Sequence, residues 1–215
     1  MFAEIKEVVQ WSSVPLLWLS GKANRKRLSG ARIEIIAMIM CSRPTPSLLM
    51  VQSVYDDCWM PAQEGVNYRE SFLAAVARGL SEECDVSIFD REGQLKSNYY
   101  LRDIEYVDTL WLPYERWGER AVVGGSEDNF FSQIQMRKKA YWAAFIIVDQ
   151  MKAVQGRPNL REVNRVEWKT FDNAATLIRG NRSDKAELLF RCLQKGMQHL
   201  VGSRRADEWL PELAD

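Results

Sequence analysis

Residues 59–86 read WMPAQEGVNYRESFLAAVARGLSEECDV, and the interpretation of the rest of the chain depends on this stretch. Residues 70–84 lack proline and carry apolar side chains at the spacing of one helix face. These side chains are Phe72, Leu73, Val76 and Leu80. We therefore predict a helix over residues 70–84, entered from a loop that contains Gly65.

Two adjacent acids, Glu82 and Glu83, lie near the end of this predicted helix. Carboxylates at the C-terminal end of a helix oppose its dipole, at a cost of about 0.3–1 kcal/mol each when exposed. A bound hard cation such as Mg²⁺ explains them, because it takes carboxylate oxygens, waters and substrate phosphates as ligands. Simple exposure to water also explains them, since charged side chains are mostly exposed. The pair alone leaves both interpretations open.

The wider spacing resembles the Nudix box, G-x5-E-x7-R-E-U-x-E-E-x-G-U, in which U is a bulky aliphatic residue. The matching positions are Glu70, Arg78, Leu80, Glu82, Glu83 and Val86. The neighbouring Pro61, Gly65, Val66 and Ser71 are also common in that family. Three positions depart from the box: Glu64 replaces the opening glycine, Gly79 replaces the acid after the arginine, and Asp85 replaces the closing glycine.

The resemblance extends over roughly residues 31–200. Residues 32–41 are almost continuously apolar and predict a buried central strand, with residues 48–55 as its hairpin partner. Residues 137–145 (RKKAYWAAF) resemble the GQKQ-type strand of Nudix enzymes that act on dinucleoside polyphosphates or RNA 5′ ends. Glu162, ahead of Trp168, resembles the glutamate that supplies a further metal ligand in those enzymes.

The order of the remaining elements predicts an α+β domain with a mixed β-sheet and helices on both faces. The resemblance implies that this domain is a Nudix-type α/β/α sandwich. Further strands are expected at residues 86–89, 99–112, 140–148 and 166–168, and helices at residues 171–178 and 184–201. Residues 113–136 are expected to form a long loop. Tyr141 and Trp142 alternate along a strand, so we expect one ring on each face, with core packing favoured over base stacking.

The resemblance implies a Mg²⁺-dependent hydrolase, with Mn²⁺ as an alternative ion, that cleaves the pyrophosphate bond of a nucleoside diphosphate-linked compound. Glu82 and Glu83 would bind metal, and Arg78 would brace Glu70, which also reaches the metal. The backbone carbonyl of Glu64 and the carboxylate of Glu162 would complete the ligand set. The catalytic residues implied are therefore Glu82, Glu83 and Arg78.

Gly79 leaves two functional hypotheses open. The residue that the family has at this position is a glutamate, which binds metal or accepts the proton of the attacking water. One hypothesis is an enzyme whose base comes from the unmatched loop, at Glu119, Glu127 or Asp128. The alternative is a catalytically degenerate Nudix-fold module that binds a nucleotide or a protein partner without turnover.

The charge composition limits which binding partners are expected. Lys and Arg number 29, as do Asp and Glu, so the formal net charge is zero and attraction to nucleic acid over the whole surface is not expected. Binding of an RNA 5′ end remains a third hypothesis, based on the basic residues 22–27 with Arg137, Lys138 and Lys139. A nucleotide-type small molecule is the expected ligand.

The four cysteines, Cys41, Cys58, Cys84 and Cys192, show no CxxC spacing, and His199 is the only histidine, so no zinc motif is present. Scattered cysteines favour a reducing cytoplasm, where they serve as small apolar residues. We expect no signal peptide and no membrane span. Residues 1–30 are taken as an N-terminal extension, 31–201 as the domain and 202–215 as a tail. A homodimer is a further expectation, with the Trp-rich N-terminus as its interface.

Overall fold

The computed structural model describes residues 31–55, 57–67, 69–111, 138–180 and 185–201. The predicted N-terminal extension, the C-terminal tail and the expected loop at 113–136 lie outside the described residues. The expected dimer interface at the N-terminus therefore stays a prediction, as does the division into residues 1–30, 31–201 and 202–215.

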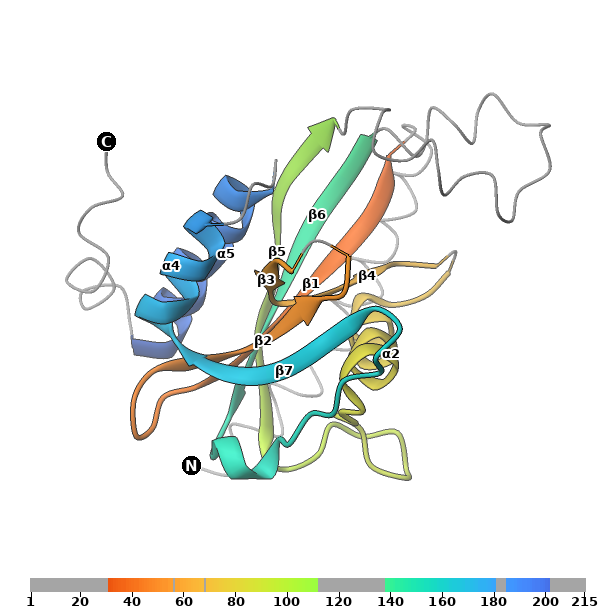
Figure 1. Ribbon diagram of the computed structural model, residues 1–215. Helices are drawn as coiled ribbons and strands as arrows, with labels where there is room; N and C mark the ends of the chain where they lie inside the picture. The colour runs from red at the N-terminus through yellow and green to blue at the C-terminus, as the bar shows by residue number, and fades with distance from the viewer. Residues whose placement is uncertain (1–30, 56, 68, 112–137, 181–184, 202–215) are drawn as a thin grey trace.

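One mixed sheet forms the centre of the molecule (Figure 1). Its strands are β1 (Arg32–Cys41), β2 (Ser47–Ser53), β3 (Trp59–Met60), β4 (Ala62–Gly65), β5 (Tyr99–Trp111), β6 (Lys138–Val148) and β7 (Val163–Thr170). The strand order is β3-β2-β1-β6-β5, while β4 pairs with β1 and β7 pairs with β2. Among the pairings of these strands, only the β1–β6 pair is parallel. The sheet is therefore mixed, and the expected α+β fold class is confirmed.

The central strand is β1, as its apolar run predicts. It pairs in parallel with β6 from Arg32↔Lys139 to Cys41↔Val148. On its other edge its first half pairs with β4 and its end with β2. Every residue of β1 after the first is buried, because the strand has neighbours on both edges and helices over both faces.

Helices cover both faces of the sheet (Figure 1). Helix α2 (Phe72–Cys84) packs on one face, against alternate β1 residues such as Ile33 and Ile35. Helices α4 (Phe171–Gly180) and α5 (Ala186–Val201) pack on the other face, against Ile36 and Met38. This alternation follows from the two-residue period of a strand. A short 3-10 helix, Met151–Ala153, precedes β7.

Three local predictions need correction. Residues 86–89 form no strand; Val86 and Ile88 are buried from a loop whose only ladder contact is an isolated bridge between Phe89 and Leu95. The expected loop through Gly65 instead contains β3 and β4. Strand β7 extends well beyond the predicted residues 166–168 because its whole length pairs with β2.

Several side-chain expectations agree with the structure. Tyr141 is fully buried on the α4/α5 face and Trp142 is buried on the α2 face, so both rings are core residues. Cys41, Cys84 and Cys192 are buried, and none of the four cysteines forms a disulfide. In the described part of the chain, no helix is both long enough and apolar enough to cross a membrane.

Candidate functional site

Helix α2 is fixed at both ends by its own sequence. The Ser71 hydroxyl accepts a hydrogen bond from the Ala74 N–H at 3.1 Å, which caps the first turn. At the other end Asp85 takes a left-handed conformation with φ 54°, and the N–H groups of Asp85 and Val86 bond back to helix carbonyls. Aspartate tolerates this conformation better than most residues. The box therefore keeps its helix end although its closing glycine is replaced.

Arg78 and Glu70 form the contact that the box resemblance implies. Arg78 donates from Nε to Glu70 Oε1 at 3.0 Å and from Nη2 to Glu70 Oε2 at 2.9 Å. Glu70 also accepts a hydrogen bond from the Asn67 N–H at 2.7 Å. Because the helix begins at Phe72, Glu70 lies in the turn before it and not within the predicted helix 70–84. Arg78 therefore fixes this turn against the helix.

The same guanidinium reaches β4 and the end of α2. Its Nη2 donates to the Gly65 carbonyl at 2.7 Å, and its Nη1 lies 3.0 Å from Glu64 Oε2 and 3.8 Å from Glu82 Oε2. The hydrogen bond to Glu70 does most to raise the pKa of Arg78 above its ordinary value, so the group stays charged. Arginine suits this place because its planar fork can donate in several directions at once.

Glu64 is accommodated without the backbone freedom of the glycine that it replaces. It lies in β4 opposite Ile35, and it is absent from the described residues with positive φ. Its Oε1 accepts a hydrogen bond from the Gly65 N–H at 2.7 Å. The side chain is therefore held at the edge of α2, beside Arg78.

Glu162 reaches the helix end through a loop that Asn159 organises. The Asn159 Oδ1 accepts hydrogen bonds from the N–H groups of Arg161, Glu162 and Val163 at 2.9–3.2 Å. Its Nδ2 donates to the Glu82 carbonyl at 2.9 Å, and its own N–H donates to the Glu83 carbonyl at 3.3 Å. Asn159 thus ties the Glu162 loop to the last turn of α2, beside the acidic pair.

The pKa of Glu83 is raised by its surroundings. Burial contributes most to raising its pKa to about 8, followed by the charges of Glu64, Glu162 and Glu82; a hydrogen bond from the Gln63 backbone opposes them. The carboxylates of Glu64, Glu82 and Glu162 are therefore close enough to act electrostatically on Glu83. The remaining expected carboxylate, Glu70, is engaged by Arg78.

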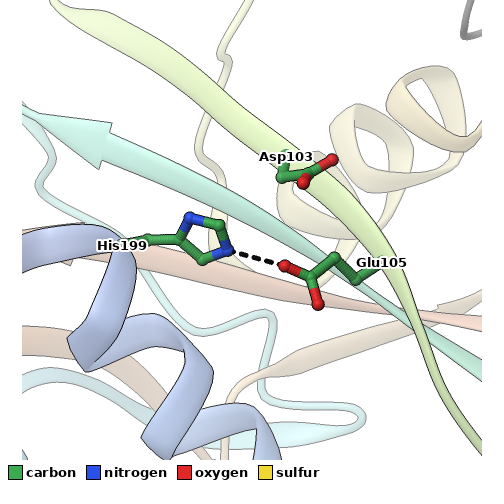
Figure 2. A group of neighbouring side chains, drawn as sticks. All are labelled: Asp103, Glu105 and His199. Carbon is green, nitrogen blue, oxygen red and sulfur yellow. Dashed lines mark hydrogen bonds and ion pairs between the residues drawn. The ribbon is translucent and has the colours of Figure 1, made fainter. Parts of the chain in front are cut away.

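A separate acidic group lies on the opposite face of the sheet, between β5 and α5 (Figure 2). Asp103, Glu105 and His199 are the only group of three described residues whose possible ligand atoms all lie within 4.8 Å of one another. Among the described residues, the carboxylate oxygens of Glu64, Glu82, Glu83 and Glu162 are thus not gathered as closely as the ligand atoms of this trio.

Glu105 in this trio is already matched by positive charge. Burial works against its ionisation, but hydrogen bonds donated by Lys195 and His199 outweigh burial and hold its pKa below the ordinary value. His199 Nε2 lies 2.8 Å from Glu105 Oε1, and its ring packs 4.5 Å from that of Phe145. These contacts tie α5 to the sheet.

The other candidates from the sequence are placed differently or not placed. Lys139 is buried and lies 2.7 Å from Glu34, so its expected role as an exposed RNA phosphate contact is wrong. Residues 22–27, Arg137 and the candidate bases Glu119, Glu127 and Asp128 lie outside the described residues. Asn159 and the side chain of Glu64 were not anticipated, because their contacts join segments that are distant in sequence.

Comparison with protein-family models and with curated protein sequences gives no match. Solved structures do match. One is a bifunctional NMN adenylyltransferase/ADP ribose pyrophosphatase from Francisella tularensis, at 15% identity and a TM-score of 0.50, over 82% of this chain and 45% of that one. The Ap4A hydrolase of C. elegans matches at 15% identity, over 75% of this chain and 96% of that one, with a TM-score of 0.48. A Nudix hydrolase from M. smegmatis, RenU, matches at 12% identity, over 77% and 83% of the chains, with a TM-score of 0.49.

At such low identity the likeness establishes the fold and leaves the activity to be argued from the site. Together with the match to the Francisella tularensis protein, the sheet order shows that this chain has the Nudix-type fold.

Proposed function

We propose that the chain is a Nudix-type hydrolase that cleaves the pyrophosphate bond of a nucleoside diphosphate-linked compound with Mg²⁺. The observation that carries this proposal is the Arg78 network. One guanidinium holds Glu70, the Gly65 carbonyl and Glu64 together beside the acidic pair Glu82 and Glu83.

The donor set fits a hard divalent cation. Glu82, Glu83 and Glu162 offer carboxylate oxygens and Glu64 offers its backbone carbonyl, and Mg²⁺ prefers oxygen ligands of these kinds. Arg78 lies beside these residues, and its N–H groups are engaged by Glu70, the Gly65 carbonyl and Glu64. Burial raises the pKa of Glu83 most, and the negative charges of Glu64, Glu162 and Glu82 raise it further.

Mg²⁺ held by these residues would neutralise the diphosphate and make water a better nucleophile. The chain's own contribution is positional. Arg78 fixes the turn of Glu70 and the end of β4, while Asn159 fixes Glu162 against the helix end. Water adds to one phosphorus, the bridging P–O bond breaks, and two phosphorylated products leave.

The substrate class is taken from the fold and its neighbours. The Francisella tularensis protein is named for ADP-ribose and the C. elegans enzyme for Ap4A, and both compounds contain a nucleoside joined through phosphoanhydride bonds. We therefore place dinucleoside polyphosphates, ADP-ribose and nucleotide sugars first. The proposal keeps the expected cytoplasmic location.

A binding module without turnover is the second candidate, and Gly79 specifically favours it. Helix α2 presents no carboxylate one turn before Glu82 and Glu83, where the box carries one. Such a module would bind a nucleotide or a protein partner through the same surface.

A substrate panel with product masses separates the two candidates. The protein is incubated with dinucleoside polyphosphates, ADP-ribose, nucleotide sugars, nucleoside triphosphates and triphosphorylated RNA, with Mg²⁺ or Mn²⁺. Turnover that the double variant Glu82→Gln, Glu83→Gln lacks would support the hydrolase. Nucleotide-dependent thermal stabilisation without product would support the binding module. Turnover unaffected by the double variant would show that the site is elsewhere.

A matched control removes a carboxylate from the other face of the sheet. Glu105→Gln alters the α5 contact and leaves the Arg78 network untouched. We expect this variant to turn over substrate like the parent protein.

A further inference from the structure

The space above Gly79 is filled by the side chain of Glu64. A Cβ atom placed on Gly79 would lie 2.7 Å from the Glu64 Cβ, 3.3 Å from its Cγ and 3.7 Å from its Oε2. The first distance is too short for any real contact, and it involves the stem of Glu64 and not a mobile tip. A side chain at residue 79 would therefore force β4 or α2 to shift as long as residue 64 carries a Cβ.

Two departures from the box are thus one coupled change. Where the box pairs a glycine in the strand with a glutamate in the helix, this chain has Glu64 in β4 and Gly79 in α2. The glutamate side chain enters the gap between strand and helix from the opposite wall.

The Glu64 carboxylate is also held in the right surroundings. Its Oε1 accepts from the Gly65 N–H at 2.7 Å, and its Oε2 lies 3.0 Å from Arg78 Nη1. The side chain is 20% exposed, so it lies at the surface of the core and still reaches solvent.

We propose that the Glu64 side chain supplies the carboxylate ligand that residue 79 cannot supply, and that Gly79 is present to admit it. The inference rests on the proposed function, because it assigns a role within the same cation site. It assigns to Glu64 a side-chain role in addition to the backbone carbonyl role that the box implies.

The steric part is tested by a stability cycle on the metal-free protein. Alanine at residue 79 gains helix propensity but meets Glu64, so Gly79→Ala should lower the Tm of the parent. In a Glu64→Gly background the obstacle is gone, and the same change should raise the Tm by about 2–4 °C. The same sign in both backgrounds would overturn the coupling.

The ligand part is tested with Mn²⁺ as the probe, by electron paramagnetic resonance titration. Glu64→Gln keeps the shape of the side chain and should weaken Mn²⁺ binding by at least about tenfold, the low end of what supporting groups at metal sites cost. The exchanged variant Glu64→Gly with Gly79→Glu should bind Mn²⁺ better than Glu64→Gly alone. Glu105→Gln should leave the titration unchanged, which separates this site from the trio on the other face.

The outcomes distinguish this inference from the proposed function. Mn²⁺ binding and turnover that both survive Glu64→Gln would overturn the inference and leave the hydrolase standing. Mn²⁺ binding that depends on Glu64, without turnover of any substrate, would support the inference and reject the hydrolase. A parent protein that binds no Mn²⁺ at millimolar concentration would overturn the inference outright.

Discussion

Arg78 and Glu70 are joined by two parallel hydrogen bonds, at 3.0 and 2.9 Å, that connect helix α2 to the turn before it. Lysine would keep the charge but could not make both bonds together with the one to the Gly65 carbonyl. We expect Arg78→Lys to lower the free energy of unfolding by about 1.5–3 kcal/mol, the range for charged hydrogen bonds. Urea denaturation would measure it. Equal stability of variant and parent would show that the network is dispensable.

Asn159 offers a test of how the Glu162 loop is positioned. Asn159→Ala removes the Oδ1 acceptor of three N–H groups and the donor to the Glu82 carbonyl. We expect kcat to fall by about tenfold or more, as for supporting groups at metal sites. KM should change little, because the loop positions the acidic group and not the nucleoside. Asn164→Ala, an exposed change on β7, is the matched control.

The stability of the metal-free protein should depend on pH through Glu83. Its pKa is about 8 in the folded chain against an ordinary 4.5, so the folded state holds its proton more tightly than the unfolded state. Stability should therefore be highest at low pH and decline as pH rises from about 4.5 to 8, by about 1.4 kcal/mol for each tenfold difference in proton affinity. Thermal unfolding in a chelator, across this range, would measure the decline.

Glu83→Gln should flatten this profile, and added Mg²⁺ should reduce the decline in the parent by compensating the charge. Glu105→Gln serves as a contrast, because the pKa of Glu105 is lowered. Its stabilising effect is present above its unfolded value and is lost as pH falls, which is the opposite direction. A profile that is flat in the parent would contradict the prediction.

Asp85 tests whether the helix end needs the closing glycine. Its φ of 54° suits glycine and is strained for most other residues. We expect Asp85→Gly to leave the Tm equal or higher, and Asp85→Val to cost about 1–2 kcal/mol through the left-handed backbone. Differential scanning calorimetry of both variants would show the order. A glycine variant as unstable as the valine variant would refute it.

Elements with strong periodicity could be predicted from the sequence, and those defined by distant partners could not. The apolar runs of β1 and β6 and the stripes of α2 and α5 were found because burial dictates each residue. Residues 86–89 alternate like a strand, yet their side chains fill the core from a loop without a pairing strand. Strand β4 was missed because Pro61 and Gly65 resemble a turn until β1 supplies a partner.

The same limit applies to the site. The spacing of the box was sufficient to predict that Arg78 meets Glu70, since both positions are fixed relative to one helix. It could not show that Glu64 fills the space over Gly79, because that depends on how β4 packs against α2. Asn159 lies 77 residues from Glu82 in sequence, and only the folded chain brings them together.

The register of β5 and β6 has a consequence for the connection between the two strands. Trp111 pairs with Lys138, so the two residues that flank the segment 112–137 are neighbours in the ladder. The entropy of closing a loop grows slowly, by about 0.6 kcal/mol for each doubling of its length. The β5–β6 ladder therefore fixes the two points at which the chain leaves and re-enters the sheet, and a longer connection between them adds little entropic cost.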